Sequence, residues 1–267
     1  MFFNGYFFYD GINSKRFGVM FANLETEKLR QLCAEYEYSA EYYNSLCKYS
    51  VTGRKWADSP LSVETEILSE KPIDAYNAKK IKRWLFNAPD FKKLYNKPPA
   101  TNKRAANAKR LYIECVFINP QEIRISGNLF GWKCTCLLAS PMAVEDSTVK
   151  TYTSFTDTVK INVDTDYSGY TYPYIKIVTD NNTADTDISI TNITDSNRTM
   201  MLTSVTAKTT VYADCRIGSV IDSSDISLYN SLADRRFLRL LPGENELRIS
   251  GDIESLEISW CNMRYYI

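Results

Sequence analysis

The residue types that could perform chemistry in this chain are cysteines, carboxylates and aromatic side chains, because the sequence contains no histidine. Without histidine, the usual general base, the Ser-His and Cys-His nucleophile pairs and most catalytic zinc sites are missing together. Most hydrolytic mechanisms therefore lack their central group. We expect no catalytic residue, no metal ligand and no cofactor, and we expect that the chain is not an enzyme.

Cysteines are the first candidates, since their thiolates could bind a metal. They are Cys33, Cys47, Cys115, Cys134, Cys136, Cys215 and Cys261. Their odd number argues against a closed disulfide framework, and residues 1–10 lack the basic region of a signal peptide, which indicates a reducing cytosol. Cys134 and Cys136 are separated by one residue, not by two as in a zinc knuckle. We interpret them as small buried side chains, with a zinc site completed by Cys115 as the alternative.

Carboxylates and glycines show no recognisable site. The acidic segment Asp180 to Asp187 lacks the spacing and the glycine of a calcium-binding loop, so we expect a solvated loop. Gly127 to Gly131 matches neither the P-loop nor the dinucleotide pattern, and we expect no nucleotide chemistry. The two carboxylates of a glycosidase, about 5 to 10 Å apart, leave no trace in a sequence. A glycosidase therefore stays a separate hypothesis without named residues.

Charge is unevenly distributed although its total is zero. The first 140 residues carry seven more basic than acidic side chains, and the remainder carries seven more acidic than basic ones, which favours docking between subunits or domains. The stretch Lys79 to Arg110 holds eleven Lys or Arg residues, one acid, and the aromatic residues Trp84, Phe91 and Tyr95. Packing explains these aromatics and no nucleic-acid motif surrounds them. We therefore favour a solvated or subunit-facing surface over nucleic-acid binding.

The elements that position these groups are mainly strands. The clearest helix runs from about Pro72 to Phe86, with Asp74 placed to favour its positive end. Its apolar positions are Ala78, Ile81, Trp84 and Leu85, spaced three and four residues apart. Between Glu25 and Cys47 a helix and a strand both remain open, because the Tyr-rich stretch Tyr36 to Tyr43 suits a strand equally well.

Alternation of apolar and polar residues predicts the strands. One predicted strand face holds Leu111, Ile113, Cys115 and Phe117, and another holds Trp132, Cys134, Cys136 and Leu138. Turns are expected at Asn119-Pro120 and at Ser126-Gly127-Asn128. Later strands are predicted at Val159 to Val163, Tyr174 to Val178, Asp187 to Ile193, Val211 to Ile217, Glu246 to Ser250 and Leu256 to Trp260. Short strands at this spacing predict a sandwich or a barrel.

Length and composition favour two domains. The 267 residues are 44% hydrophobic and 24% charged, and no run approaches the ~18 to 20 apolar residues of a membrane span. A stretch rich in Thr, Asp and Ser lies between Ser140-Pro141 and Tyr172-Pro173. We predict a boundary near residue 141, which gives domains 1–140 and 141–267.

Segments along the whole chain resemble one known family. In the first half they are Phe3-Asn4-Gly5, Asn13 to Val19, Trp84-Leu85, Tyr112 to Pro120, and Gly131-Trp132 leading to Ala139-Ser140-Pro141. At the end they are Phe237 to Asn245, where Pro242-Gly243 supplies a tight turn before a strand, and Leu256 to Tyr265. In type and order they are similar to phage distal tail proteins, the Dit family of siphophage baseplate hubs.

This resemblance implies a mainly β, two-domain fold: an N-terminal β-sandwich or barrel-like ring domain with one α-helix, and a galectin-like C-terminal β-sandwich. It implies a structural protein of the tail tip or baseplate, synthesised in the host cytoplasm and resident in the virion. Its partners would be five further copies in a hexameric ring, the tail tube protein, the tail-associated tip protein and receptor-binding proteins. DNA would only pass through the central channel.

A second hypothesis makes the C-terminal sandwich a carbohydrate-binding module for host recognition. Four tyrosines could stack on sugar rings: Tyr167, Tyr170, Tyr172 and Tyr174. Strand and loop tyrosines more often serve packing or face solvent, so the structural hub is the leading hypothesis.

Overall fold

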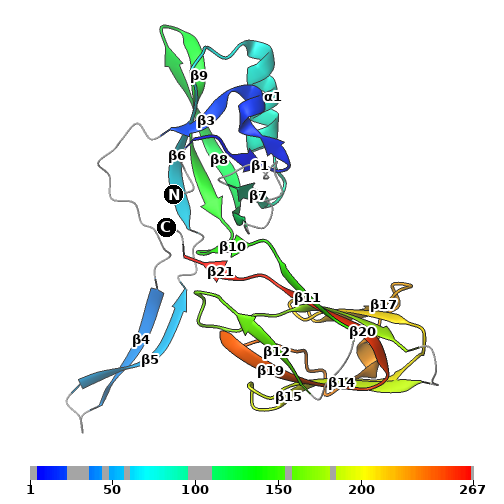
Figure 1. The fold of residues 1–267 in the computed structure, drawn as a ribbon. Coiled ribbons are helices and arrows are strands. Elements are labelled where there is room, and N and C mark those ends of the chain that lie inside the picture. The colour runs from blue at the N-terminus through cyan, green and yellow to red at the C-terminus, as the bar shows by residue number, and fades with distance from the viewer. Residues whose placement is uncertain are drawn as a thin grey trace. The chain divides into compact units, whose positions relative to one another are not determined.

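The computed structural model describes residues 5–22, 36–43, 48–56, 61–95, 110–153, 158–180 and 185–265. The chain divides into two compact units, an N-terminal unit of residues 1–144 with 265–267 and a C-terminal unit of residues 145–264. Strands dominate both units (Figure 1), which confirms the mainly β fold predicted from the sequence. No helix in the described ranges is long and apolar enough to cross a membrane.

An antiparallel sheet forms the frame of the N-terminal unit. Its strands are β1 (Phe8–Tyr9), β2 (Ile12–Asn13), β3 (Val19–Ala22), β6 (Ser62–Ser69), β7 (Lys92–Tyr95), β8 (Leu111–Ile125), β9 (Asn128–Leu138) and β10 (Ala143–Glu145). The strand order is β2-β1-β7-β8-β9-β6-β3, with β10 beside β8, and the short 3-10 helix η1 (Ser14–Phe17) connects β2 to β3. In the described residues this sheet is open and does not close into a barrel.

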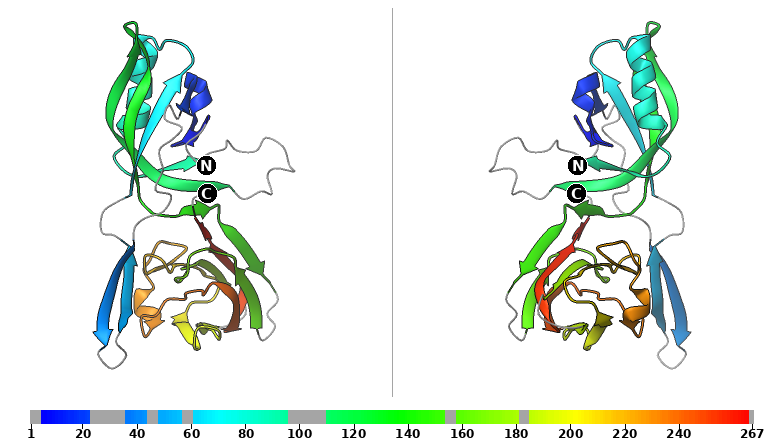
Figure 2. Two further views of the ribbon diagram at one scale, coloured as in Figure 1. Left: turned by 90° about the vertical axis from the view of Figure 1, so that its left-hand side faces the viewer. Right: turned by 90° about the vertical axis from the view of Figure 1, so that its right-hand side faces the viewer.

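One helix, α1 (Ala75–Phe86), packs along the sheet, as Figure 2 shows. Its buried residues are the predicted Ala78, Ile81, Trp84 and Leu85. The helix begins later than the sequence predicted, because Asp74 is its N-cap and accepts a hydrogen bond from the Asn77 backbone N–H at 2.9 Å. Hydrogen bonds from the Asn77 backbone and side chain lower the pKa of Asp74. Pro72 therefore precedes the cap and is not the first helical residue.

The turn predicted at Asn119-Pro120 is wrong, because β8 continues through it. The register between β8 and β9 shifts between Ile118 and Gln121, and Asn119 has a φ of 54°. Proline has no N–H to donate to the ladder, so the pair forms a bulge inside the strand. The turn between β8 and β9 falls at Ser126-Gly127, as predicted.

A two-stranded hairpin lies between β3 and β6 in the sequence. It consists of β4 (Tyr36–Tyr43) and β5 (Lys48–Trp56), paired antiparallel from Tyr36 opposite Trp56 to Tyr43 opposite Lys48. The strand alternative for the Tyr-rich stretch is therefore confirmed. The rest of the ambiguous segment, residues 25–35 and 44–47, lies outside the described residues.

The C-terminal unit is a sandwich of two five-stranded antiparallel sheets. One sheet has the order β11 (Thr148–Tyr152), β20 (Ile253–Trp260), β13 (Tyr174–Thr179), β16 (Thr210–Asp214) and β17 (Ser219–Asp222). The other has β12 (Thr158–Val163), β19 (Gly243–Ser250), β14 (Thr186–Asn192), β15 (Arg198–Val205) and β18 (Leu232–Ala233), and η3 (Tyr229–Ser231) and β21 (Met263–Arg264) complete the unit.

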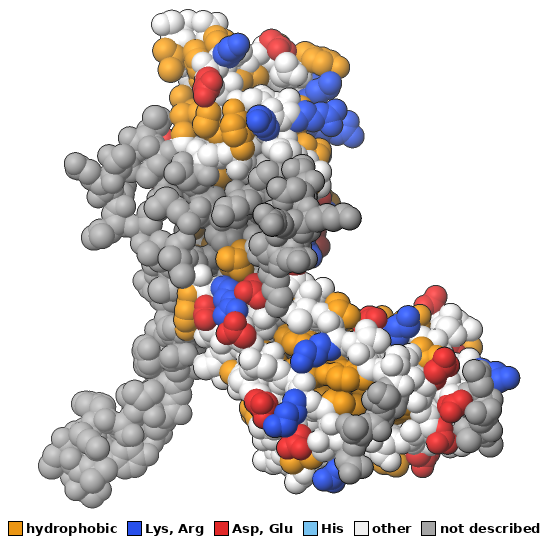
Figure 3. All heavy atoms as spheres, in the orientation of Figure 1, with side chains coloured by type: hydrophobic (Ala, Val, Ile, Leu, Met, Phe, Trp, Pro, Cys, Tyr) orange, Lys and Arg blue, Asp and Glu red, His pale blue; other side chains and the backbone are white. Residues whose placement is uncertain are grey.

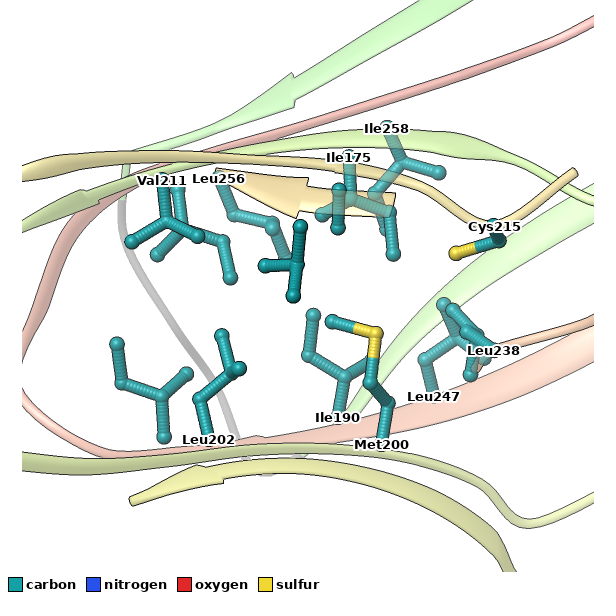
Figure 4. Close-up of a cluster of buried hydrophobic side chains, with 14 of the residues drawn as sticks. Ile175, Ile190, Met200, Leu202, Val211, Cys215, Leu238, Leu247, Leu256 and Ile258 are labelled. Carbon is teal, nitrogen blue, oxygen red and sulfur yellow. The ribbon is translucent and has the colours of Figure 1, made fainter. Parts of the chain in front are cut away.

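Buried aliphatic side chains from both sheets meet between them (Figure 4). Ile175 and Leu256 come from one sheet, and Ile190 and Leu202 come from the other. The predicted strand at Val211 to Ile217 ends early, at Asp214, because the Asp214 carboxylate accepts a hydrogen bond from the Arg216 backbone N–H at 3.0 Å and starts a turn.

Candidate functional site

Three tyrosines form an exposed row on the C-terminal unit. Tyr170, Tyr172 and Tyr174 are 39%, 45% and 41% exposed, whereas Thr171 between the first two is buried. Backbone hydrogen bonds of 2.9 and 2.8 Å join Thr171 to Leu240 and hold the segment in an extended form. Alternation in an extended segment turns the three rings to the same side. We call these three residues the tyrosine row.

Tyr167 does not belong to the tyrosine row, although the sequence hypothesis included it. It is half-buried, and its ring folds back over the backbone of Gly169. A Cβ atom added at Gly169 would lie 2.4 Å from this ring, so an alanine there would have to displace the ring. The structure therefore brings together three of the four tyrosines that the sequence singled out.

Arg239 lies beside the tyrosine row and was missed by sequence reasoning. Its guanidinium lies 3.7 Å from the centroid of the Tyr170 ring. It also donates two hydrogen bonds, of 2.7 and 3.1 Å, to the carboxylate of the buried Asp195. This bidentate pair raises the pKa of Arg239 and fixes the plane of its guanidinium. The row thus offers aromatic faces beside a fixed cation.

The candidate zinc cysteines lie inside the core of the N-terminal unit. Cys115, Cys134 and Cys136 are all buried. Burial raises the pKa of Cys134 to about 12 and also raises that of Cys136. Zinc binds thiolates, so these shifts oppose metal binding and favour the interpretation as small buried side chains. No group of three or more His, Cys, Asp or Glu in the described residues could hold a metal ion.

The remaining cysteines are only partly described. Cys215 is buried, and Cys261 is half-buried. Cys33, Cys47 and residues 181–184 of the acidic segment Asp180 to Asp187 lie outside the described residues.

The basic stretch Lys79 to Arg110 is divided between α1 and β7, and residues 96–109 lie outside the described part. Trp84 is buried, and its indole N–H donates to the Tyr9 backbone carbonyl at 3.0 Å. Tyr95 is buried as well, which confirms that packing explains these two aromatics. Phe91 is 39% exposed, so the packing interpretation is wrong for this ring.

Basic side chains from this stretch line an open groove beside α1, with a volume of about 510 Å³. Its cations are Arg16 from η1, Lys80 and Arg83 from α1, and Lys92 from β7. Figure 3 shows Lys and Arg side chains gathered over this part of the N-terminal unit. We call this cavity the basic groove.

A second groove, of about 540 Å³, lies on the other side of α1 at the tip of the β8–β9 hairpin. Here Glu122 is paired with Lys82 at 2.6 Å and with Arg124 at 2.7 Å. Both partners lower the pKa of Glu122. The two cations favour the ionised form of this carboxylate, which makes Glu122 a poor general acid.

The fold defines a class of protein: a β protein of two compact units with one helix packed on the N-terminal sheet. A family model described as a phage tail protein N-terminal domain matches residues 3–137, and a model described as a phage tail C-terminal domain matches residues 144–260. The chain belongs to this family of phage tail proteins and is a structural component of the tail.

Solved structures show the same fold along the whole chain. The Dit protein of phage SPP1, described as a paradigm of the hub adsorption apparatus in phages that infect Gram-positive bacteria, is similar with a TM-score of 0.67 and 9% identity over 97% of this chain and 98% of that one. A chain of the phage P2 baseplate in its activated conformation with Ca is similar with a TM-score of 0.56 and 8% identity over 99% of both chains. The Dit-like resemblance inferred from the sequence is confirmed. No curated protein sequence matches the chain.

Proposed function

We propose that this chain forms a homo-hexameric ring in the hub at the distal end of a phage tail. The ring joins the tail tube protein to the tail-associated tip protein, supports receptor-binding proteins, and leaves a central channel through which DNA passes. Residues 1–140 form the ring, and the sandwich of residues 141–267 decorates its outside. The chain works without a catalytic residue, metal or cofactor, and it is made in the host cytoplasm before it enters the virion.

The observation that carries this proposal is the order and completeness of the family match. Both tail-protein models match in sequence order, and the likeness to the SPP1 hub protein extends over both units. The N-terminal sheet adds a physical argument. It is open, with β2 and β3 as its outer strands in the described residues. Phe21 of β3 is already bridged to Gly5, so β2 is the outer strand that we expect to pair with a neighbouring copy. Head-to-tail contacts between copies close into a ring when the rotation from one copy to the next divides a full turn.

Native mass spectrometry and negative-stain electron microscopy of the purified full chain test the proposal. We expect a species of six copies and six-fold particles with a central hole. Dimers or monomers as the largest species across the concentration range would contradict the ring.

The tyrosine row favours a second function, recognition of a cell-surface saccharide. Tyr172 and Tyr174 expose ring surface, and Arg239 beside them supplies fixed N–H groups. Aromatic faces with nearby polar groups are a common arrangement for binding sugars. A glycan array with the full chain tests this function. Binding that is lost in Tyr172→Ala/Tyr174→Ala but kept in Tyr229→Ala, a 37% exposed ring outside the row, would support it. Failure of the wild-type chain to bind any host cell-wall glycan would contradict saccharide recognition.

A further inference from the structure

The basic groove has a floor and a rim of different character. Phe17 and Trp84 supply apolar surface, and their ring centroids lie 5.3 Å apart. Arg16, Lys80 and Arg83 on the rim are all exposed. A charged rim around an apolar floor is typical of a surface that binds a protein segment.

The rim cations are not neutralised within the described residues. No carboxylate there lies within ion-pair distance of Arg16, Lys80 or Arg83. The one acid of the groove, Asp10, lies 4.0 Å from Lys92. By contrast, Lys82 on the same helix is paired with Glu122 at 2.6 Å. The groove therefore presents uncompensated positive charge, which attracts an anionic partner.

A complementary surface exists on the C-terminal unit. The turn between β19 and β20 and the ends of β13 and β14 meet there, since the Asp180 N–H donates to the Asp252 carbonyl at 3.0 Å and the Asp252 N–H donates to Thr186 at 3.4 Å. The acidic residues of this surface, which we call the acidic end, are Asp180, Asp185, Asp187, Asp252 and Glu254. All except Asp180 are exposed, and Figure 3 shows Asp and Glu side chains gathered at this end of the unit. The backbone N–H of Lys208 donates to the Asp180 carbonyl at 3.4 Å, which places one basic residue next to this end.

We propose that the basic groove binds the acidic end of a second copy of this chain. Charge complementarity is the argument: the cations and the carboxylates lie on different units of one sequence whose two halves have opposite charge. Every copy carries both surfaces, so each added copy presents a new groove and a new acidic end. This contact is made through charged side chains and not through strand pairing, and it does not depend on the number of copies in that ring.

Zero-length carbodiimide cross-linking locates the contact, because it joins lysine amines to carboxylates that touch. A mixture of unlabelled and ¹⁵N-labelled full chains separates links between copies from links within one copy. We expect Lys80 or Lys92 to be linked to Asp185, Asp187, Asp252 or Glu254 in pairs of mixed label. Absence of these links, or their presence only within one label, would overturn the proposal. A wild-type chain that stays monomeric would form no mixed-label links and would overturn the proposal in the same way.

Charge reversal provides the matched variants. Arg16→Glu/Arg83→Glu reverses the groove while keeping its lysines, Asp252→Lys/Glu254→Lys reverses the acidic end, and Lys71→Glu/Arg248→Glu reverses two exposed cations elsewhere. We expect each of the first two variants to lower the yield of mixed-label links at least about tenfold, since like charges then face each other. Their combination should restore the links, and the third variant should leave them unchanged.

A groove that serves another partner, such as a nucleic acid, predicts a different pattern. The links would then be absent in the wild type, and Arg16→Glu/Arg83→Glu would weaken binding of a fluorescent DNA duplex. That result would also overturn the proposal. A ring seen by microscopy without these links would leave the proposed function intact and reject only the groove contact.

Discussion

Asn192 and Asn245 form a buried amide pair in the C-terminal unit: the Asn192 side chain donates to the Asn245 side-chain oxygen at 2.9 Å, and neither residue is exposed. The Asn245 oxygen also accepts from the Leu241 N–H at 2.8 Å. Its nitrogen donates to the Leu241 and Gly243 carbonyls at 2.7 and 3.1 Å. Asn245 therefore holds the Pro242-Gly243 turn that begins β19, a turn that the sequence revealed only through its proline and glycine.

Asn245→Ala should destabilise the C-terminal unit by about 3 kcal/mol, because buried polar groups around the turn lose their partner. Urea denaturation followed by far-UV circular dichroism measures the change. The control is Asn162→Ala, an exposed residue on β12, which should shift the free energy of unfolding by less than about 0.5 kcal/mol. Equal effects of the two substitutions would show that the amide pair adds nothing to the free energy of unfolding.

Gly131→Ala should destabilise the N-terminal unit by about 2 to 3 kcal/mol, since an added Cβ would lie 2.0 Å from the Ile67 backbone oxygen on β6. Two paired strands would have to separate to admit it. Gly169→Ala is the comparison, because the Cβ there meets the Tyr167 side chain, which can move. Thermal unfolding of both variants should give the larger loss for Gly131→Ala; the reverse order would contradict close packing of β6 against β9.

Alkaline pH should weaken both units through their buried thiols. Burial raises the pKa of Cys134 and of Cys215 from an ordinary value of 9.0 to about 12. The unfolded chain therefore loses these protons first, and stability is fully present below pH 9 and falls as pH rises toward about 12. Urea titrations between pH 8 and 11 should show this fall.

A Cys134→Ala/Cys215→Ala variant is the control for this pH dependence. It should be less stable at pH 8 but should lose less stability as the pH rises. A slope as steep as that of the wild type would assign the pH dependence to other groups, such as Tyr9, whose pKa burial also raises.

Arg264→Ala should destabilise the C-terminal unit by about 2 kcal/mol, because it removes charged hydrogen bonds to Glu145 and Asp164, each at 2.7 Å. The Glu145 side chain is only 13% exposed and would lose this partner. Lys160→Ala breaks a pair with Glu244 in which both side chains are more than 60% exposed, so solvent screens the pair and the loss of stability should be clearly smaller. Hydrogen exchange of the β11 and β20 amides measures the loss of stability in both variants. Similar protection of these amides in the two variants would contradict the predicted difference.

Periodic patterns predicted the parts of the fold that local sequence determines. The stripe of α1 and the alternating faces of β8 and β9 are buried as expected, because a core selects apolar side chains at the helical or strand period. Asn119-Pro120 was misread because a proline with a preceding left-handed residue suits a turn and a bulge equally well. The N-cap at Asp74 was missed because its side-chain bond outweighs the preference of Pro72 for a first turn.

The candidate site was only partly predictable. The alternation of Tyr170, Tyr172 and Tyr174 is visible in the sequence, but Arg239 and its partner Asp195 are 44 residues apart, and nothing local pairs them. The basic groove combines η1, α1 and β7, which only the fold brings together. Long-range contacts of this kind depend on strand order, which periodicity does not give.

Electron cryomicroscopy of the intact phage tail tip is the most direct test of the hub function. We predict that density for this chain forms one ring of six copies where the tail tube ends, with residues 1–140 around the channel and residues 141–267 outside. Density for this chain at any other place in the virion, or in a ring with another number of copies, would contradict it.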